Sequence, residues 1–471
     1  MWLRMRTCTI TCLLVCLVIG GSTASRVAAQ IDTTESGAPQ DVAYGTPEIW
    51  RLIEVPPALL SDDGYAGDLR VGDLDGDGAV DFIVFRSTGG NMKPCFVGAF
   101  DVEGHVMWRH GSGGGQPLRP GPVTVYDFDA DGSAEVLCFF VDPAIEAEAS
   151  SMKDVVLQIR SGRDGHVLRQ ATCPTLQACH GSGPNWCHQR LLIANFRGTT
   201  EPRDFVIKLG ARVLAFDEHL KLLWTYDVKW NEYSHCSAYI PAVGDIDGDG
   251  KDEVNGGFYL LDEDGRPIWE GQIARHMDSV AIAPWDGGKM RAICSGYGHV
   301  LGSKGEVILR LGEELVPHGQ EVRVADFDVS SPGPEMIVRC QGHNPDVLVV
   351  ANDGTVRRRF ALNDSPNHTG MEAVYWNGEG RDALLYNGGV LWRADGRLVA
   401  ELPGLPKPLG PAKMGWYHCI AADVCSDPRE EIALYNPWDR RVWIFTPAPV
   451  RPEAFRGYEA TPRQYNPRLM D

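Results

Sequence analysis

The sequence predicts an all-β fold, an eight-bladed β-propeller with four-stranded antiparallel blades. The first observation behind this prediction is a unit of apolar strand, acidic loop and second strand that recurs eight times. Its clearest copies are RVGDLDGDGAVDFIVF at 70–85, PVTVYDFDADGSAEVLCFF at 122–140 and PAVGDIDGDGKDEV at 241–254. Fainter copies begin at Leu191, Val280, Val322, Glu372 and Cys419. Successive loops begin 40 residues apart at the closest (Asp245 to Trp285) and 68 at the widest (Asp127 to Asn195). A period of this size is typical of a radial array of blades.

The second observation is a hairpin pattern that lies between copies of the first unit. Examples are AFDVEGHVMW, which ends at Trp108, and LLDEDGRPIW, which ends at Trp269. A turn of the Asp-Gly type between apolar runs favours a hairpin, because glycine tolerates the positive φ that the turn requires. Two hairpins per period make a four-stranded blade.

The third observation is that the last unit is short by one strand. It runs CIAADV, EEIALYN and RRVWIF and then gives way to a proline-rich tail. The segment EIWRLIEV at 48–55 precedes the first repeat and belongs to no other blade, so we expect it to supply the missing outermost strand. Seven blades is the alternative, if the weak unit at Val280 or Glu372 merges with a neighbour.

The chain divides into four predicted segments. Residues 1–29 read as a signal peptide, with Arg4 and Arg6 before an apolar run and Val27-Ala28-Ala29 as the cleavage site. Residues 30–47 are a linker, 48–446 the propeller and 447–471 a tail that packs across the barrel side or is disordered. No other stretch is long and apolar enough to span a membrane. We therefore expect a secreted or periplasmic monomer.

Composition excludes some partners, but it does not decide whether the cysteines form disulfides. A formal net charge of −19 argues against nucleic acid and anionic membranes, because phosphate binding needs a basic surface. Ten cysteines remain after the signal peptide, an even number that disulfides would use in an oxidising compartment. Cys173, Cys179 and Cys187 lie close in sequence; a disulfide is favoured over a zinc site there, because the spacings match no standard finger.

The acidic loops predict structural Ca²⁺ sites. In three copies, carboxylates occupy positions one, three, five and nine of the loop, and glycine permits the bend. Alternate carboxylates in a tight turn converge, and oxygen-only ligands select a hard cation. The expected metal ligands are Asp73, Asp75, Asp77 and Asp81; Asp127, Asp129, Asp131 and Glu135; and Asp245, Asp247, Asp249 and Glu253. The copies at Asp326 and Asp423 have lost ligands and are expected to bind nothing.

The connectors that lead into six consecutive inner strands carry a histidine at equivalent places. These residues are His188, His235, His276, His318, His368 and His418. Connectors of this kind cluster at one mouth of a propeller, and a ring of imidazoles has no evident packing use. Several cations, phenols and flat aromatic side chains flank them: Arg190, Arg275, Tyr233, Tyr239, Trp230, Trp416 and Tyr417. Such a set suits an acidic sugar, although blade packing would equally explain Trp230 and Trp416.

These features together resemble a known group of enzymes. The DxDxDG-bearing blades, the stretch HQRLLIANFRG at 188–198 and the histidine-led inner strands are similar to the β-propeller polysaccharide lyases. That superfamily includes rhamnogalacturonan lyases, ulvan lyases and rhamnose-glucuronate lyases, with a related rhamnosidase family. The likeness covers nearly the whole chain from about residue 48. Eight blades and calcium loops fit the rhamnogalacturonan lyases, whereas the histidine ring looks more like the other two groups, which have seven blades.

The resemblance implies β-elimination at a uronic acid of a rhamnose-containing acidic polysaccharide. One group neutralises the carboxylate, a base removes the C5 proton and an acid protonates the departing C4 oxygen. His188 and His235 are the first candidates for base and acid, with Tyr233 or Tyr417 able to act as the acid. Arg275 or Arg190, with His276, would neutralise the carboxylate. The remaining expected substrate-binding residues are His318, His368, Trp416 and His418.

Three alternatives stay open at this point. A glycosidase of the same superfamily would release terminal rhamnose instead. An adhesion propeller of the FG-GAP type would bind a glycan or protein without chemistry. Several histidines at the mouth could also hold Mn²⁺ or Zn²⁺ in addition to the structural Ca²⁺.

Overall fold

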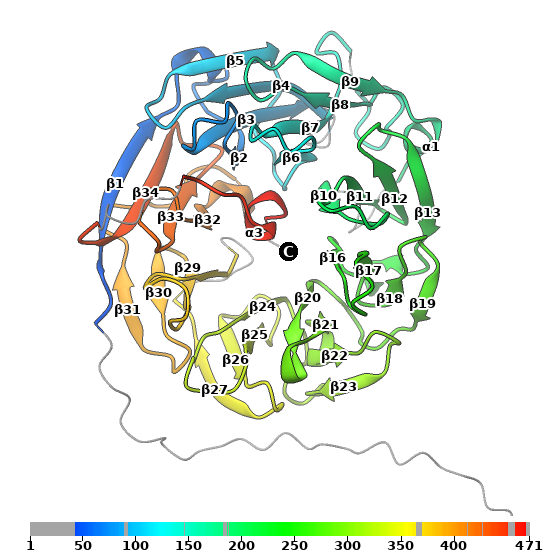
Figure 1. Cartoon of the computed structure of the whole chain (residues 1–471), viewed down its shortest axis with the longest axis vertical. Helices are drawn as coiled ribbons and strands as arrows, with labels where there is room; N and C mark the ends of the chain where they lie inside the picture. Colours follow the sequence, from blue (N-terminus) through cyan, green and yellow to red (C-terminus); the bar gives the residue numbers. More distant parts are fainter. Residues whose placement is uncertain are drawn as a thin grey trace, which may run out of the picture.

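Eight four-stranded antiparallel sheets are arranged in a ring, so the protein is an eight-bladed β-propeller (Figure 1). The predicted fold class and blade number are thus confirmed. The structure is a computed structural model that describes residues 43–88, 93–145, 147–181, 186, 188–363, 370–411, 413–425, 427–450 and 457–467. The predicted signal peptide, His368 and Cys187 lie outside these residues. Within them, no helix is long and apolar enough to cross a membrane.

The blades follow one another along the chain. The first four are β2–β5 (Asp68–Gly72, Asp81–Thr88, Lys93–Phe100, Val106–Gly111), β6–β9 (Val123–Tyr126, Glu135–Phe140, Val156–Arg160, Val167–Ala171), β10–β13 (Leu192–Ala194, Asp204–Leu209, Arg212–Asp217, Leu222–Asp227) and β16–β19 (Ala242–Gly244, Glu253–Asn255, Tyr259–Leu261, Pro267–Glu270). The next three are β20–β23 (Val280–Trp285, Lys289–Cys294, His299–Leu301, Val307–Arg310), β24–β27 (Glu321–Ala325, Glu335–Arg339, Asp346–Val350, Val356–Ala361) and β28–β31 (Glu372–Val374, Leu384–Asn387, Val390–Trp392, Leu398–Glu401).

The eighth blade joins the two ends of the propeller. Its strands β32 (His418–Ala422), β33 (Glu431–Tyr435) and β34 (Arg441–Ala448) come from the C-terminal side, and β1 (Thr46–Glu54) comes from the N-terminal side. β1 pairs antiparallel with β34, from Thr46 opposite Ala448 to Glu54 opposite Arg441. The last blade therefore cannot form without residues from both ends.

Shorter elements lie outside the blades. They are a two-stranded hairpin of β14 (Asn231–Glu232) and β15 (His235–Cys236), the helical turns α1 (Pro174–Gln177) and α3 (Pro462–Tyr465), and 3₁₀ turns at Pro57–Leu59, Asp286–Gly288, Gly296–Gly298 and Lys413–Gly415.

The outermost strand of each blade is its most exposed strand. Every residue of β2, β4, β6 and β7 is buried, whereas the outermost strands β5 and β9 are largely exposed. Strands β2, β4, β6 and β7 are buried on both faces because both faces pack against neighbouring blades. Gly265 shows the turn chemistry of the hairpins: its φ is +76°, and a Cβ there would lie 2.5 Å from the Trp224 ring of the preceding blade.

The C-terminal segment enters the middle of the ring, where α3 lies close to the centre in Figure 1. The expectation that it packs across the barrel side or is disordered does not hold for residues 457–467. The Asn466 side chain accepts from the Ile193 N–H (2.7 Å) and donates to the Ile193 carbonyl (2.9 Å). The innermost edge of a blade leaves such backbone groups without a strand partner, and the amide satisfies both.

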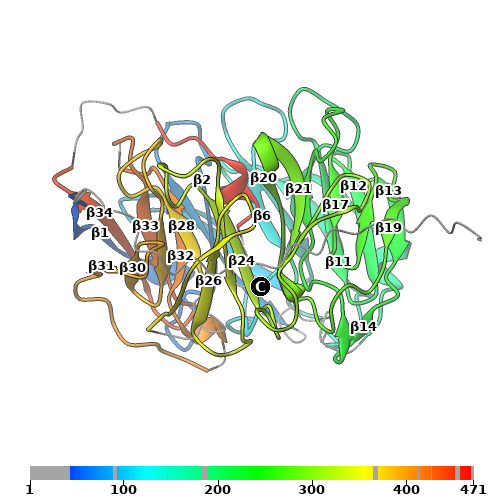
Figure 2. The same ribbon diagram turned by 90° about the horizontal axis from the view of Figure 1, so that it is seen from below.

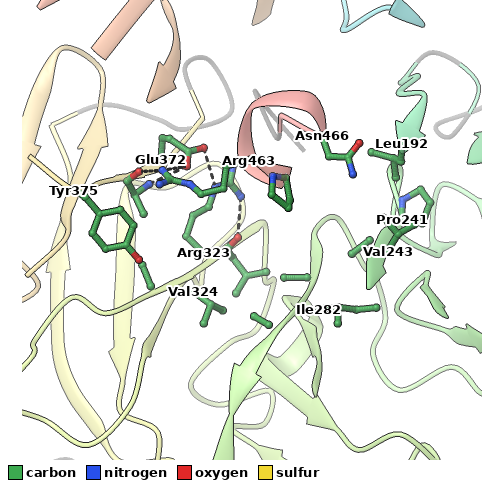
Figure 3. A pocket seen from close by; sticks show the side chains of 17 residues that line it. Leu192, Pro241, Val243, Ile282, Arg323, Val324, Glu372, Tyr375, Arg463 and Asn466 are labelled. Carbon is green, nitrogen blue, oxygen red and sulfur yellow. Dashed lines mark hydrogen bonds and ion pairs between the residues drawn. The ribbon is translucent and has the colours of Figure 1, made fainter. Parts of the chain in front are cut away.

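Arg463 fixes α3 to two other blades. Its guanidinium forms ion pairs with Glu430 (2.6 Å) and Glu372 (3.1 Å) and donates to the Ala373 carbonyl. Figure 3 shows Arg463 between Glu372 and Asn466 at the wall of a cavity of about 230 Å³. The opposite part of that cavity is apolar. The C-terminal turn thus links inner strands that are far apart around the ring.

Loss of the Arg463 contacts should destabilise the propeller. We expect Arg463→Ala to lower the free energy of unfolding by about 2–4 kcal/mol, because two carboxylates lose a charged hydrogen-bond partner. The melting temperature would measure the effect. Arg266→Ala, which removes an exposed pair with Asp264, is the matched control and should change little. Equal melting temperatures for the two variants would contradict the assigned role of α3.

Candidate functional site

The connectors into successive inner strands meet at one face of the ring. We call this the connector face and define it by residues 188–191, 233–241, 274–279 and 317–320, which precede β10, β16, β20 and β24. In Figure 2 the β14 strand marks this face at the lower edge, and the arrowhead of β20 points to the opposite edge. The acidic loops follow the inner strands, so they lie at that opposite face.

A cavity of about 620 Å³ opens at the connector face. Five of the predicted site residues line it: His188, Tyr233, Arg275, His276 and His318. Its other polar or aromatic lining side chains are Arg119, Ser234, Tyr239, Asp278, Tyr297, Gln320 and His343. The connectors that contribute belong to five successive blades, from the one that begins with β6 to the one that begins with β24. This cavity is the candidate functional site.

Four rings form a continuous wall of the cavity. His188 stacks on Tyr239 with ring centroids 4.7 Å apart and 15° between the planes. Tyr239 meets His276 edge-on at 6.0 Å, and His276 meets His318 edge-on at 5.2 Å. Burial is the main cause that raises the pKa of the Tyr239 phenol, and the neighbouring Asp278 carboxylate raises it further. Tyr239 therefore keeps its proton at neutral pH.

Asp278 lies at the base of this wall and joins two of its histidines. Its Oδ2 lies 2.9 Å from His276 Nδ1 and 3.0 Å from His318 Nε2. Burial alone would raise the pKa of Asp278, but the hydrogen bonds from the two imidazoles outweigh it and lower the pKa. Burial would likewise lower the pKa of His276, but its bonds with Asp278 and Cys236 raise it to about 10.

A second layer of side chains supports the wall from behind. Cys236 Sγ lies 2.9 Å from His276 Nε2, so both ring nitrogens of His276 are engaged. Lys208 is buried beneath the same connector, where it donates to Ser237 Oγ (2.8 Å) and to the Ala238 carbonyl. Burial lowers the pKa of Lys208 to about 7. The connector that carries Cys236 and Tyr239 is therefore anchored from below.

Several predicted site residues lie outside the cavity. His235 is exposed, with its Nδ1 2.7 Å from Ser234 Oγ, and it faces a shallower depression beside Arg275. Arg190 is buried in the middle of the ring, where its Nε donates to the Pro467 carbonyl (3.3 Å). His418 is fully buried, its ring 5.5 Å from that of Tyr435.

Tyr417 and Trp416 also lie elsewhere. The Tyr417 hydroxyl donates to the buried Asp439 carboxylate (2.6 Å), and burial raises its pKa. Trp416 is half-buried and does not line the cavity. The histidines occupy equivalent positions in the sequence repeats. However, the connectors of the eight blades are spread around the full circle of the propeller. Only connectors of neighbouring blades can share one cavity.

Sequence reasoning missed Asp278, Arg119, Tyr297, Gln320 and His343. Asp278 follows His276 by two residues, so its place in the same connector was a usable signal. Tyr297 and His343 lie in the β21–β22 and β25–β26 loops, which return to the connector face. No repeat marked those loops in the sequence.

The acidic loops bring their carboxylates together at the opposite face. Ligand atoms lie within 4.8 Å of one another in three groups: Asp73, Asp75 and Asp81; Asp127, Asp129 and Glu135; and Asp245, Asp247 and Asp249. The groups omit three of the predicted ligands, namely Asp77, Asp131 and Glu253. Burial first, and then the neighbouring Asp75 and Asp77, raise the pKa of Asp81 to about 7. A bound cation would relieve this repulsion, so the three groups can hold metal ions.

The ninth loop residue also has a role that needs no metal. Asp81 accepts from the Leu74 N–H, and Glu135 accepts from the Phe128 N–H. The degenerate loops keep the same contact, since Glu335 accepts from the N–H groups of Phe327 and Asp328. The carboxylate thus closes the turn whether or not the other ligands are present.

The described cysteines form no disulfide. Nine of them are buried and free, including Cys173 and Cys179. Cys187, the third cysteine predicted to lie near these two, is outside the described part of the chain. The Cys173 sulfur caps α1 by accepting from the Leu176 N–H at 3.5 Å. The expected staple of this connector is not found among the residues that the structure describes.

Comparison with known proteins points to one enzyme group. The family model "Rhamnogalacturonan lyase family 11, C-terminal domain" matches residues 56–178. The rhamnogalacturonan exolyase YesX of Bacillus subtilis is 24% identical over 290 residues, which cover 50% of this chain and 47% of the relative. The endolyase YesW of the same organism is 25% identical over 266 residues, 48% of this chain and 42% of the relative. The chain matches somewhat less than half the length of these curated relatives.

Solved structures share the fold over most of the chain. A rhamnogalacturonan lyase of Bacillus licheniformis has a TM-score of 0.64 at 18% identity, covering 88% of this chain and 79% of that one. The exotype lyase YesX gives 0.61 at 18% identity, covering 84% and 76%. The biofilm matrix protein Bap1 of V. cholerae gives 0.57 at 14% identity, covering 90% of both chains. The resemblance to the β-propeller polysaccharide lyases is confirmed, while the shape alone also occurs in a matrix protein.

The position of Tyr417 predicts a structural effect. Tyr417→Phe removes a hydrogen bond to the buried Asp439, which should lower the free energy of unfolding by about 1–3 kcal/mol. Tyr233→Phe is the matched control, because Tyr233 is 74% exposed and lines the cavity. Thermal unfolding of both variants tests this assignment. An unchanged melting temperature for Tyr417→Phe would contradict it.

Proposed function

We propose that this relative of the β-propeller polysaccharide lyases cleaves a rhamnose- and uronate-containing acidic polysaccharide by β-elimination. The observation that carries the proposal is the wall of His188, Tyr239 and His276 in the cavity of the connector face, with Arg275 at its rim. The volume of about 620 Å³ falls within the usual range for ligand pockets, about 300–1,000 Å³. The sequence similarity to rhamnogalacturonan lyases supports the substrate class.

The charges around the cavity suit an anionic sugar. Arg275 is exposed and makes no side-chain ion pair with any residue that the structure describes. Arg119 lines the same cavity and is half-buried. The chain as a whole is strongly acidic, so a local pair of arginines is the feature that would attract a uronate. We assign to these two guanidinium groups the role of binding and neutralising the uronate carboxylate of the substrate.

The reaction needs one base and one acid on the same sugar. We assign His188 as the base that removes the C5 proton, because its imidazole lines the cavity and histidine is the most common general base of enzymes. Tyr239 stacks on it and retains its own proton, which suits donation to the departing C4 oxygen. The electron pair of the C5–H bond forms the C4=C5 double bond as the C4–O bond breaks.

The acidic loops and the N-terminus complete the proposal. The three carboxylate groups would bind Ca²⁺, because oxygen ligands at alternate loop positions suit a hard cation. Arg4, Arg6 and the apolar run after them would direct export, which places the enzyme where polysaccharides occur.

Activity would appear as ultraviolet absorbance from the unsaturated uronate on mixing with rhamnogalacturonan. We expect His188→Ala to reduce turnover at least about 100-fold, since a positioned acid or base contributes about 10²–10⁴-fold. His235→Ala is the control, because its exposed imidazole lies outside the cavity and should leave the rate unchanged.

Other results would reject parts of the proposal. Full activity of His188→Ala with an intact fold would remove the base assignment. Release of free rhamnose without any ultraviolet product would instead identify a glycosidase.

Calcium removal should lower thermal stability. We expect a chelator to reduce the melting temperature by several degrees, because buried carboxylates such as Asp81 would lose their counter-ion. Three ions per chain are expected, and two in Asp129→Asn, by equilibrium dialysis with calcium. Asp328→Asn, in a degenerate loop, should still bind three. Equal calcium content in both variants would show that the loop containing Asp129 binds none.

A further inference from the structure

A second cavity, of about 530 Å³, lies in the seam between the first two blades. It is lined by residues of β5, β7, β8, β9 and the β7–β8 loop, and we call it the seam cavity. Its outermost strands, β5 and β9, lie at the outer rim of the ring in Figure 1. It shares no lining residue with the connector-face cavity. We propose that the seam cavity binds a hexuronate, a sugar with one carboxylate, and that Arg160 holds this carboxylate.

Arg160 occupies a position that is apolar in every equivalent blade. In seven blades the pairing of the third strand with the fourth shifts by one residue, and Arg160 is the third-strand residue at this bulge in the second blade. Its counterparts in the other six blades are Phe100, Phe216, Leu261, Leu301, Val350 and Trp392. A charge in place of an apolar core residue destabilises a fold unless a partner compensates it. The exception therefore needs an explanation other than packing.

The Arg160 guanidinium is buried without a counter-charge from the described residues. Arg160 is 4% exposed and lies over the Phe140 ring, 4.8 Å from its centroid. Its Nε donates to Gln158 Oε1 (2.9 Å) and its Nη1 to the Gly165 carbonyl (3.0 Å). No described residue forms an ion pair with it or accepts from Nη2. A carboxylate bound in the cavity would supply both the missing charge and an acceptor.

The rim of the seam cavity favours a sugar over a small inorganic anion. Asp142 and Asp154 line it, and neither forms an ion pair with Arg160. Two carboxylates would repel a doubly charged phosphate, but they accept hydrogen bonds from hydroxyl groups. The exposed Gln170 side chain also lines the cavity; its Oε1 accepts from Gln158 Nε2 (2.6 Å), which leaves its amide N–H groups as donors.

The remaining lining groups are uncharged or apolar. Burial first, and then the charge of Arg160, lower the pKa of the His110 imidazole, which is therefore neutral at pH 7. A neutral imidazole offers one donor and one acceptor to hydroxyl groups. Ile145, which is 38% exposed, and Val156 provide apolar surface for the C–H groups of a sugar ring. Arg160 is thus the cation in this cavity that can hold the carboxylate.

The experiment measures binding of galacturonate to the full, calcium-loaded chain by saturation-transfer difference NMR. Every protein in the series carries Arg275→Ala, which weakens any binding in the connector-face cavity. We expect this chain to bind galacturonate. Adding Arg160→Leu should weaken the binding at least about 10-fold, because the charge-assisted hydrogen bonds to the carboxylate are lost.

Arg169→Leu in the same Arg275→Ala chain is the matched control. It removes a neighbouring arginine of β9 that does not line the seam cavity. Arg160→Leu should fold, since leucine occupies the equivalent position in two other blades, and circular dichroism with the melting temperature checks this. Arg160→Lys, which keeps the charge but loses the planar fork, is the substitute if it does not fold. Absence of galacturonate binding before Arg160 is changed, or equal binding in the Arg160 and Arg169 variants, would overturn the proposal.

Two comparison ligands test the chemical class. Galactose lacks the carboxylate and acetate lacks the hydroxyl groups, so we expect each to bind at least about 10-fold more weakly than galacturonate. Galactose that binds as tightly would overturn the role of Arg160, and acetate that binds as tightly would overturn the assignment of a sugar. No turnover is measured, so the seam cavity and the proposed lyase function can fail independently.

Discussion

The pairing of β1 with β34 is the constraint on which the rest of the structure depends. Each blade buries its inner and middle strands only between two neighbours, so an open ring would expose the faces of its first and last blades. The eight-residue register from Thr46 to Glu54 joins the ends of the propeller and removes that exposure. The C-terminal turn adds a second link across the middle, where Arg463 and Asn466 bind inner strands of different blades.

The packing of neighbouring blades also creates the candidate site. A single connector presents two or three polar side chains, and none of these sets is a site by itself. Neighbouring blades bring His188, Tyr239, His276 and His318 into one wall, and the buried Asp278 holds two of them in fixed positions. The cavity that results is polar and basic in a protein that is otherwise acidic. The acidic loops at the opposite face serve the fold, because even degenerate copies keep the carboxylate that closes the turn.

The repeats in the sequence predict the number of blades and the position of the acidic loops. Strong period-two patterns and Asp-Gly turns act locally, so they can be read from short segments. The sequence also shows the connectors that carry a histidine before an inner strand. Equivalent positions around a ring, however, do not predict the distances between the histidine side chains. Three of the six, His188, His276 and His318, meet in the cavity, while His418 is buried in its own strand. The position of the tail could not be predicted, because its polar contacts with distant strands leave no periodic pattern in the sequence.

The sequence by itself thus determined the architecture of this protein: eight blades, their strand order and the loops that can hold cations. These depend on hydrophobic periodicity and turn chemistry, which each unit carries within its own residues. Only the tertiary structure decided which side chains share a cavity. Distances such as those from Asp278 to His276 and His318 depend on how neighbouring blades pack, and His318 lies 40 residues further along the chain. No local pattern encodes that separation, because the blade of β20–β23 between the two connectors must fold before these atoms meet.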